Sequence, residues 1–438
     1  MAKHRSINTF KPSKKAQPTV DSRPIELRID SLSDDGRGVA RHNNKVVFIA
    51  DALMGEQVVA KISRSHKRFD EARLIEVTEP SDDRVEPPCA IYERCGGCQL
   101  QHLSYAGQLM YKQSRFAKLI AATAPSTLIP SILHGENTGY RHRARLAYSG
   151  GHLGFKAKAS HDIVPVDTCP LLEDSLNTVL AQSRGPIQGF FGDNAKGEVI
   201  LTADFRGRIG IRILKEGFVD LKRSEKLADD IKAPAFLHSV VGNKGQSWLG
   251  AHEPLYFQAT DTRTLRYQPG DFTQVNTSIN RQIVKQCLSW LAPQAGERIT
   301  DYFCGLGNFS VALADAGAQV IGFDSGKSMI ESANQQAREG KLAIEYFCAD
   351  LFNDAEIIVP ASCHKVILDP PRAGAKKLCE RIAKQKAITT VVYVSCDPAT
   401  LARDLAILSQ ASFKITDAAM ADMFPHTHHI ESVVLLQR

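Results

Sequence analysis

Residues 298–324 read RITDYFCGLGNFSVALADAGAQVIGFD. Arg298 to Phe303 predicts a strand, the glycine-containing turn after it leads into a helix, and Gln319 to Phe323 predicts a second strand. A strand, a helix and a strand in this order are typical of a parallel sheet covered by helices. Further strands are predicted at residues 366–368, at residues 391–395 and near residue 433. We therefore expect residues 266–438 to form a Rossmann-like, doubly wound parallel α/β domain.

The turn at residues 304–308, CGLGN, has the features of a ligand-binding loop. It follows the first strand, and ligands of doubly wound domains bind at the carboxyl ends of strands. Asp324 ends the next strand, where a carboxylate can accept hydrogen bonds from both hydroxyls of a ribose. Because the third glycine of the dinucleotide fingerprint is absent, the loop favours a nucleoside without pyrophosphate, such as S-adenosylmethionine, over NAD. Asp350 ends the third strand region and can contact an adenine amino group, although an ordinary capping acid is the more common explanation of a lone aspartate there.

Cys396 directly follows the buried-type strand at residues 391–395. Asp397-Pro398 is a cap and first-turn signal, so a helix is expected to begin beside the thiol. The positive end of a helix favours the thiolate, which makes Cys396 a candidate nucleophile. Most lone cysteines are inert packing groups, so that interpretation stays open, and Cys304 in the glycine turn is a rival nucleophile.

Two further strand ends carry acids. Asp369 follows the strand at residues 366–368, where it can hydrogen-bond the edge of a base. The run Asp-Pro-Pro-Arg is similar to the Asp-Pro-Pro-aromatic signature of amino-methyltransferases, but Arg372 in place of the aromatic residue counts against that chemistry. Residues 426–431 read HTHHIE, and three close imidazoles without a second ligand group are more often loop residues than metal ligands. Glu431 is better interpreted as a general base.

A separate set of cysteines indicates a metal site. These residues are Cys89, Cys95, Cys98 and Cys169. Three thiols within ten residues, two of them around paired glycines, are typical of a soft-metal site. Four thiolates suit an iron–sulfur cluster or a tetrahedral zinc ion, and the spacing favours the cluster modestly, because structural zinc usually comes from two Cys-x-x-Cys pairs. Unligated cysteines are the remaining alternative.

The N-terminal part of the chain predicts a different class of domain. Residues 21–80 alternate short β-rich runs with turns, which predicts a small β-barrel of the OB type, either a nucleic-acid module or a structural barrel. Residues 1–20 carry five of the six net positive charges and no acid. We expect this tail to be disordered, either steering the chain toward a polyanion or serving as a solvated arm.

Residues 81–265 are expected to form a central domain that holds the cysteine set. Within it, Arg141, Arg143 and Arg145 occupy alternate positions and so share one face if the segment is a strand. Arginines interleaved with aromatic residues suit unpaired RNA, with a merely solvated strand face as the alternative.

Composition limits the remaining classes. The chain has 438 residues, 43% of them hydrophobic, which is enough for the cores of two or three domains. It shows neither a cleavable apolar leader nor an apolar run long enough to span a membrane. We therefore expect a cytoplasmic protein, with ten cysteines serving as ligands, nucleophiles or packing groups rather than as disulfides.

Together the motifs resemble those of the bacterial 23S ribosomal RNA uracil-C5-methyltransferases that carry an N-terminal TRAM domain and a [4Fe-4S] cluster. The resemblance extends from about residue 22 to the C-terminus. It is carried by the cysteine set and by segments 36–40 (GRGVA), 272–276 (FTQVN), 303–309 (FCGLGNF), 369–372 (DPPR), 395–401 (SCDPATL) and 423–431 (MFPHTHHIE).

The resemblance implies a role for each candidate residue. The S-adenosylmethionine site would be lined by Gln274, Phe303, Asn308, Asp324 and Asp350. Asp369 would lie beside cofactor and uracil, Cys396 would be the nucleophile and Glu431 the base. Cys89, Cys95, Cys98 and Cys169 would hold the cluster, which shapes the RNA-binding surface rather than transferring electrons. Asp324 departs from the glutamate of some relatives, and Pro371 from the alanine of others.

The implied partner is 23S ribosomal RNA, and we expect the chain to act without a membrane and as a monomer. The alternatives within the family are another ribosomal uridine or a transfer RNA, although transfer RNA enzymes generally lack both barrel and cluster cysteines. Outside it, an iron–sulfur nicotinamide oxidoreductase and a non-enzymatic RNA-binding module remain. Radical methylthiotransferases also join a TRAM domain to a cluster, but their cysteines are more tightly spaced than Cys89, Cys95 and Cys98.

Overall fold

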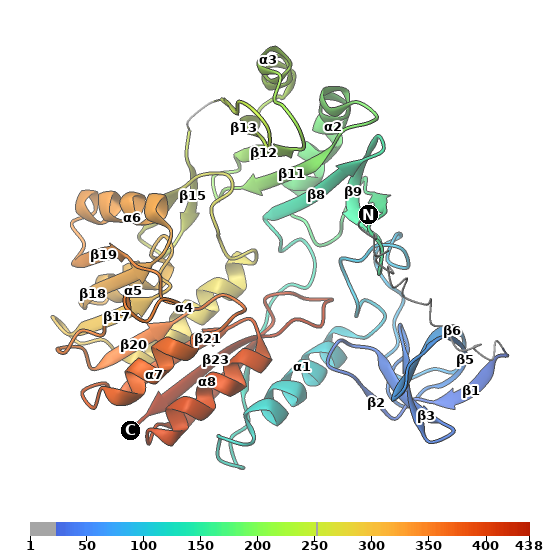
Figure 1. Cartoon of the computed structure of the whole chain (residues 1–438), viewed down its shortest axis with the longest axis horizontal. Coiled ribbons are helices and arrows are strands. Elements are labelled where there is room, and N and C mark those ends of the chain that lie inside the picture. The colour runs from blue at the N-terminus through green and yellow to red at the C-terminus, as the bar shows by residue number, and fades with distance from the viewer. Residues whose placement is uncertain (1–22, 251–252) are drawn as a thin grey trace, which may run out of the picture. The chain divides into compact units, whose positions relative to one another are not determined.

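The computed structural model describes residues 23–250 and 253–438 (Figure 1). The described chain divides into two compact units, the first ending at Arg84 and the second running from Val85 to Arg438. The predicted basic tail at residues 1–20 lies outside the described residues.

The first unit is a β-sheet that closes on itself. Its strands are β1 (Ile25–Arg28), β2 (Ser31–Leu32), β3 (Gly38–His42), β4 (Lys45–Ile49), β5 (Gln57–Ser65) and β6 (Phe69–Glu79), in the order β1-β5-β6-β4-β3-β2. The two outer strands are consecutive in the chain, and the residues between them bond to both sides. The amide of Ile29 donates to Glu56 O at 2.9 Å, and that of Asp30 donates to Val39 O at 2.8 Å. The N-terminal β-domain is therefore present as the sequence predicted.

The second unit contains a large sheet, here called the C-terminal sheet. Its strand order is β19-β18-β17-β20-β21-β23-β22-β7. The strands are β7 (Ser131–Leu133), β17 (Arg298–Tyr302), β18 (Gln319–Asp324), β19 (Ile344–Cys348), β20 (Lys365–Leu368), β21 (Thr390–Ser395), β22 (Lys414–Ala421) and β23 (Glu431–Gln437). The first five strands in this order run parallel. From β17 the chain adds β18 and β19 on one side of the sheet and then β20 and β21 on the other side, so the strand order reverses at β17. The carboxyl ends of β17 and β20 therefore flank a crevice of the kind in which ligands bind.

The predicted parallel arrangement does not hold at the last strand of the chain. Strand β23 is antiparallel to both β21 and β22. The connection between β22 and β23, residues 422–430, is too short for the crossover that a parallel pair requires. We call this segment the β22–β23 loop. The sequence analysis also missed β7, which pairs in parallel with β22 and comes from far earlier in the chain.

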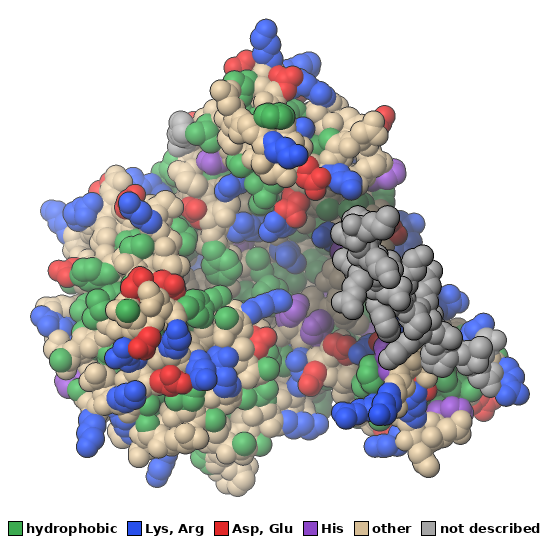
Figure 2. All heavy atoms as spheres, viewed as in Figure 1, with side chains coloured by type: hydrophobic (Ala, Val, Ile, Leu, Met, Phe, Trp, Pro, Cys, Tyr) green, Lys and Arg blue, Asp and Glu red, His purple; other side chains and the backbone are tan. Residues whose placement is uncertain are grey.

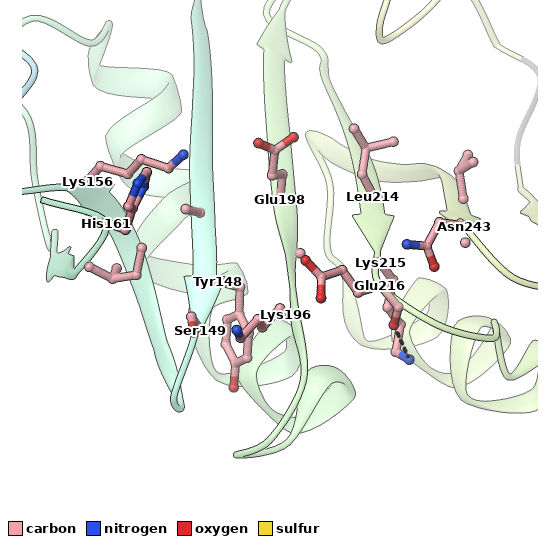
Figure 3. Close-up of a pocket in the computed structure, with 15 residues that line it drawn as sticks. Tyr148, Ser149, Lys156, His161, Lys196, Glu198, Leu214, Lys215, Glu216 and Asn243 are labelled. Carbon is pink, nitrogen blue, oxygen red and sulfur yellow. Dashed lines mark hydrogen bonds between the residues drawn. The ribbon is translucent and has the colours of Figure 1, made fainter. Parts of the chain in front are cut away.

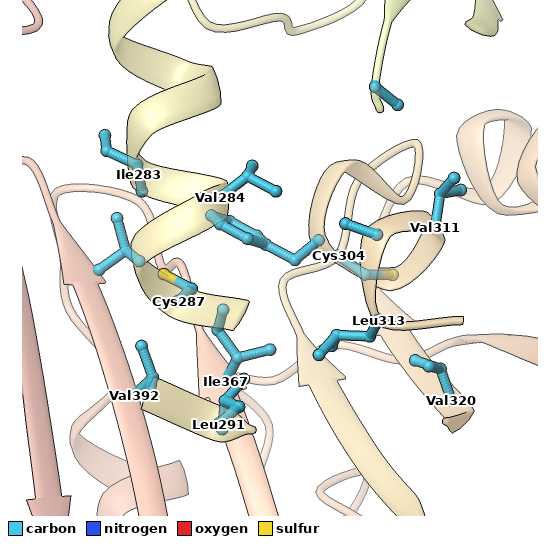
Figure 4. Packing of buried hydrophobic residues seen from close by; sticks show 14 of the residues in the cluster. Ile283, Val284, Cys287, Leu291, Cys304, Val311, Leu313, Val320, Ile367 and Val392 are labelled. Carbon is cyan, nitrogen blue, oxygen red and sulfur yellow. The ribbon is translucent and has the colours of Figure 1, made fainter. Parts of the chain in front are cut away.

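Helices cover both faces of the C-terminal sheet. One face carries α4 (Thr277–Leu291), α5 (Asn308–Asp315) and α6 (Lys327–Glu339), and the other carries α1 (Tyr105–Ile120), α7 (Lys376–Lys384) and α8 (Pro398–Gln410). On the first face, Ile283 and Cys287 of α4 pack toward Ile367 of β20 and Val392 of β21 (Figure 4). The doubly wound arrangement is thus present, and α1 contributes to it although it precedes the domain predicted from residue 266.

The central sheet has the order β10-β9-β8-β11-β12-β13-β14. Its strands are β8 (Arg143–Ser149), β9 (His152–Lys156), β10 (Ile163–Pro165), β11 (Lys196–Ala203), β12 (Ile209–Lys215), β13 (Ala235–Gly242) and β14 (Trp248–Leu249). Helices α2 (Asp174–Phe191) and α3 (Leu221–Asp230) bury one face. A hairpin of β15 (Leu255–Gln258) and β16 (Thr264–Tyr267) precedes α4.

Two of the three alternating arginines lie in the central sheet. Arg143 and Arg145 belong to β8, whereas Arg141 precedes the strand and forms two isolated β-bridges, one with Leu172 and one with Asn276. Arg143 donates to Asp271 O at 2.7 Å, and Arg145 pairs with Glu198. Two of the predicted RNA-binding arginines therefore bind groups of this chain.

None of the helices within residues 23–250 and 253–438 combines the length and apolar character needed to cross a bilayer.

Candidate active site

A cavity of about 530 Å³ opens at the carboxyl ends of the C-terminal sheet. Its lining includes every residue that the sequence proposed for cofactor or catalysis: Gln274, Phe303, Asn308, Asp324, Asp350, Asp369, Cys396 and Glu431. These side chains come from segments up to 157 residues apart in the sequence, so the sheet topology brings them together. Figure 2 shows the surface of the second unit hollowed, with hydrophobic side chains inside the hollow.

The glycine turn and Asp324 form one wall of this cavity. Asp324 Oδ2 accepts a hydrogen bond from Gly305 N at 3.1 Å, and Oδ1 accepts one from Gly326 N at 2.8 Å. These bonds fix the carboxylate while leaving acceptor capacity on both oxygens for a ligand. Gly307 has φ 96°, and a side chain there would lie 2.1 Å from the hydroxyl of Tyr346, so the turn requires glycine at this position.

Asn308 begins α5 and is held by a residue that the sequence analysis missed. Its amide group exchanges two hydrogen bonds of 2.9 Å with Asn280 of α4, and both side chains line the cavity. The available signal was a polar residue on the otherwise apolar face of the helix at residues 277–291.

Two aromatic rings mark the far end of the cavity. Phe303 has φ 64°, a left-handed conformation that costs energy in a residue other than glycine. Its ring lies 5.9 Å from that of Phe352, which is 43% exposed and also lines the cavity. Asp350 Oδ1 accepts from Phe352 N at 2.9 Å, so the aspartate both makes an ordinary turn and faces the cavity. The sequence analysis missed Phe352, since no motif contains it.

Cys396, Asp369 and Glu431 form the other end of the cavity. They follow β21, follow β20 and begin β23, respectively. Burial raises the pKa of Cys396 to about 12, the carboxyls of Glu431 and Asp369 act in the same direction, and Arg372 opposes them. Burial also raises the pKa of Asp369 and, together with the Asp369 charge, raises that of Glu431 well above the usual range.

The sequence analysis expected a helix terminus to favour the Cys396 thiolate, and that expectation is wrong in direction. The side chain of Asp397 accepts from Thr400 N at 2.9 Å and so caps the first turn of α8. The cap places a carboxylate at the positive end of the helix, where it offsets the dipole. Desolvation and the neighbouring acids then dominate.

Cys304 is the weaker nucleophile candidate. Its side chain is buried, and its sulfur lies against Gly322 of β18, where an added Cβ would be 3.0 Å away. Burial raises the pKa of its thiol well above the usual value. The residue therefore packs beneath the glycine turn.

The histidines of the β22–β23 loop do not form a metal site. Within residues 23–250 and 253–438, no three His, Cys, Asp or Glu side chains converge closely enough to hold a single metal ion. His429 lines the cavity, and burial lowers its pKa to about 4. His426 faces away toward α1, where its Nδ1 lies 3.2 Å from the side-chain nitrogen of Gln108.

The cysteine set gathers beside the central sheet. Three of these residues pack around Tyr92 and Tyr140: Cys89, Cys98 and Cys169. The backbone of Cys95 forms an isolated β-bridge with Ala157, just after β9. All four remain free thiols. Burial, together with the neighbouring Cys169, Cys95 and Cys89, raises the pKa of Cys98 to about 12, so the four thiols lie within electrostatic reach of one another.

Comparison with known proteins places this chain. A model of the tRNA (uracil-5-)-methyltransferase family matches residues 251–438, and a TRAM domain model matches residues 23–75. The 23S rRNA (uracil(1939)-C(5))-methyltransferase RlmD of Chromohalobacter salexigens is 39% identical over 434 residues, covering 94% of this chain and 89% of the relative. The chain belongs to the RlmD family. RlmD of Shewanella sediminis is 36% identical over 428 residues, covering 95% and 96% of the two chains.

A solved structure supports the same fold. The crystal structure of Pyrococcus abyssi tRNA (uracil-54, C5)-methyltransferase in complex with S-adenosyl-L-homocysteine matches with a TM-score of 0.74 at 24% identity, covering 94% of this chain and all of that one. Membership of the RlmD family identifies the first unit as a TRAM domain and the second as containing an S-adenosylmethionine-dependent methyltransferase domain. It favours methyl transfer over the nicotinamide oxidoreductase that the sequence left open.

Proposed function

We propose that this chain methylates C5 of uridine 1939 in 23S ribosomal RNA, with S-adenosylmethionine as the methyl donor. The proposal rests on one observation: a cavity that joins a nucleoside-type wall to Cys396 and Glu431, in a chain aligned with RlmD over 94% of its length. The cofactor supplies an electrophilic methyl group on a positively charged sulfur. We assign Gln274, Phe303, Asn308, Asp324 and Asp350 to its binding, with Asp369 between cofactor and uracil.

The residues at the other end of the cavity account for the chemistry. Uracil C5 is too weak a nucleophile to accept a methyl group directly, so the sulfur of Cys396 adds to C6 and shifts electrons onto C5 and O4. C5 then takes the methyl group, while the bond between that group and the sulfonium sulfur breaks and neutral S-adenosylhomocysteine is left. Glu431 removes the remaining C5 proton, the electron pair restores the C5–C6 double bond, and the Cys396 sulfur leaves.

The electrostatics of the cavity suit proton transfer. Because burial raises the pKa of Glu431 and Asp369, each ionised carboxylate is a stronger base than one in water. A carboxylate of this kind can accept the proton of the Cys396 thiol or of uracil C5. The raised pKa values of Glu431 and Asp369 thus lie closer to those of the thiol and the C5–H group from which a proton must be removed.

The RNA partner is supported by the open face of the central sheet. A hollow of about 520 Å³ lies on this face, lined by Lys156 of β9, Lys196 of β11 and Lys215 of β12 (Figure 3). Glu198 and Glu216 line the same hollow, and the Lys215 amine donates to two backbone carbonyls. Lys156 and Lys196 are suited to contacts with phosphates. We assign this face and the TRAM domain to holding the RNA while the target uridine leaves its stack.

Comparing 5-methyluridine in 23S ribosomal RNA from cells with and without this protein tests the function. Position 1939 should lose its methyl group in the deletion strain and regain it when the wild-type chain is supplied. A Cys396→Ala chain is the matched control and should not restore it. Retained methylation at 1939, with loss at another ribosomal or transfer RNA uridine, would assign the same chemistry to a different substrate.

We further propose that Cys89, Cys95, Cys98 and Cys169 hold a [4Fe-4S] cluster. The residues fit this group, because all four are free thiols, three of them pack around Tyr92 and Tyr140, and the four lie within electrostatic reach of one another. Such clusters take one thiolate at each corner, so their ligands need not meet at one atom. The bound cluster would tie the cysteine segment, residues 89–98, to Cys169.

Protein purified without oxygen is expected to absorb broadly near ~400 nm and to contain about four iron and four sulfide per chain. Replacing Cys98 with serine should remove both signals, since burial leaves no substitute ligand at that corner. Replacing the exposed Cys348 with serine is the matched control and should leave them unchanged. Stoichiometric zinc without iron or sulfide would show that the cluster assignment is wrong.

A further inference from the structure

The β22–β23 loop, which leads directly into Glu431, is held mainly by a part of the chain far from it in sequence. The α1 helix supplies three side chains one or two turns apart, on a single face. Gln108 binds the peptide of His426, Lys112 binds Asp422 and Phe424, and Arg115 donates to His428 O at 2.7 Å. The loop therefore depends on α1 for its shape.

The cysteine segment makes the second set of contacts. The residues immediately after Cys98 turn so that the amides of Gln99 and Leu100 both donate to His426 O at 3.0 Å. The Gln99 side chain reaches back to Gly96 O at 3.0 Å, between Cys95 and Cys98. The turn is thus bonded on one side to the cysteine segment and on the other to the β22–β23 loop.

His426 is the point at which these contacts meet. Its amide donates to Gln108 Oε1 at 2.8 Å, and its carbonyl accepts from the Gln99–Leu100 turn. The residue has φ 66°, a left-handed conformation that persists only where the surroundings enforce it. Removing the bonds on either side would therefore release the backbone toward an ordinary conformation and move the residues that follow it.

A change in the backbone at His426 would affect cavity residues on both sides of it in the loop. Phe424 lies two residues before His426, while His429 and Glu431 lie three and five residues after it, and all three line the cavity. The carbonyl of Pro425 also accepts from the hydroxyl of Tyr140 at 3.3 Å, and Tyr140 packs with Cys98. The cysteine pocket and the catalytic cavity are therefore joined by a continuous set of hydrogen bonds and packing contacts.

We propose that Gln108 and the Gln99–Leu100 turn are positioning residues, which set the place of Glu431 through the strained peptide of His426. A well-ordered cysteine segment then keeps Glu431 in place, and loss of that order slows the removal of the C5 proton. This inference rests on the proposed function for the role of Glu431, but the contacts themselves can be tested without methyl transfer.

The test measures hydrogen–deuterium exchange of peptides covering residues 422–431 in the full chain. Three samples are compared with the anaerobic cluster-loaded wild type: wild type stripped of iron by a chelator, Gln108→Met and Gln113→Met. Gln108→Met preserves side-chain volume and removes the acceptor for His426 N. Gln113 of α1 is the matched control, because its side chain bonds to Pro130 O rather than to the loop.

Exchange in residues 422–431 is expected to become about fivefold faster in the stripped protein and in Gln108→Met, the change that one lost net hydrogen bond produces. Gln113→Met should match wild type. Peptides covering β21 should keep their protection in every sample, which shows that the sheet remains folded. Unchanged protection of residues 422–431 in both the stripped protein and Gln108→Met would overturn the proposal.

A second readout separates positioning from general stability. Gln108→Met should lower kcat with little change in KM for S-adenosylmethionine, because Asn308, Asp324 and Asp350 lie outside the β22–β23 loop. It should also accumulate a methylated covalent RNA adduct, since a displaced Glu431 removes the C5 proton slowly. A fall in kcat without adduct, together with unchanged exchange, would contradict the positioning role while leaving the proposed reaction intact.

Discussion

Replacing Cys396 with alanine should abolish methyl transfer, lowering kcat/KM by about four orders of magnitude or more, the scale seen when a covalent nucleophile is removed. The expected loss is large because uracil C5 has no other route to electron density. S-adenosylmethionine binding should persist, since the proposed cofactor residues come from other segments of the chain than Cys396. Methyl incorporation into a 23S ribosomal RNA fragment and calorimetric binding of the cofactor measure the two effects.

An RNA substrate with 5-fluorouridine at the target position gives the sharper test of the same assignment. Fluorine at C5 cannot leave as a proton, so the wild-type chain should form an adduct that survives denaturation. Cys396→Ala should form none, while Cys348→Ala, which alters an exposed cysteine outside the cavity, should behave as wild type. Adduct formation by Cys396→Ala would remove Cys396 from the mechanism.

The pKa of Cys396 predicts how the rate of adduct formation changes with pH. Burial and the carboxyls of Glu431 and Asp369 raise it, so the thiolate is the minor form at neutral pH. The thiolate fraction of a group below its pKa grows about tenfold with each pH unit. The initial rate of adduct formation should therefore rise from about pH 6 to about pH 9. A rate that is flat over this range would indicate a thiolate stabilised in the complex.

The sequence could indicate which side chains share the cavity because strand ends are local features. Asp324, Asp369 and Cys396 each follow a short apolar run with a recognisable turn after it, and the topology of a doubly wound sheet brings such ends together. Their convergence on one cavity needed no knowledge of long-range contacts. Phe352 was missed because no local signal distinguishes it from an ordinary exposed aromatic residue. Asn280 was missed although it is a polar residue on the apolar face of its helix, because that pattern alone does not say what the side chain binds.

Three features could not be predicted because they depend on distant segments. Strand β7 is only three residues long and pairs with β22, which follows it by about 280 residues. The high pKa of Cys396 comes from burial and then from Glu431 and Asp369, which the chain supplies from other strands. The buried ion pair of Lys112 with Asp422 likewise joins α1 to a loop about 310 residues later. Local patterns carry no information on such pairs.

Replacing Glu431 with glutamine should trap the reaction after methylation. The amide has nearly the shape of the carboxyl group but cannot take the C5 proton, so the Cys396 sulfur cannot leave. The steady-state rate should fall by roughly 10²- to 10⁴-fold, the contribution typical of a general base. A covalent protein–RNA species should accumulate on unmodified RNA, and mass spectrometry should show that it carries the added methyl group.

Two controls connect this trapped species to the proposed chemistry. The double variant Cys396→Ala/Glu431→Gln should form no adduct, because the sulfur that holds the RNA is absent. Glu380→Gln changes an exposed carboxyl on α7, outside the cavity, and should turn over normally. Normal release of methylated product by Glu431→Gln would show that another group removes the proton.

Asp369 is the group that could replace Glu431, and the structure allows the two to be separated. Burial raises the pKa of both, and the charge of Asp369 contributes to the high pKa of Glu431. Asp369 also accepts a hydrogen bond from Gln274, which ties it to the cofactor side of the cavity. Asp369→Asn should therefore weaken cofactor or uracil binding without accumulating a methylated adduct. If that variant, and not Glu431→Gln, trapped the methylated species, the proton would leave toward Asp369, and the hydrogen bonds that hold the β22–β23 loop would serve to shape the cavity rather than to place its base.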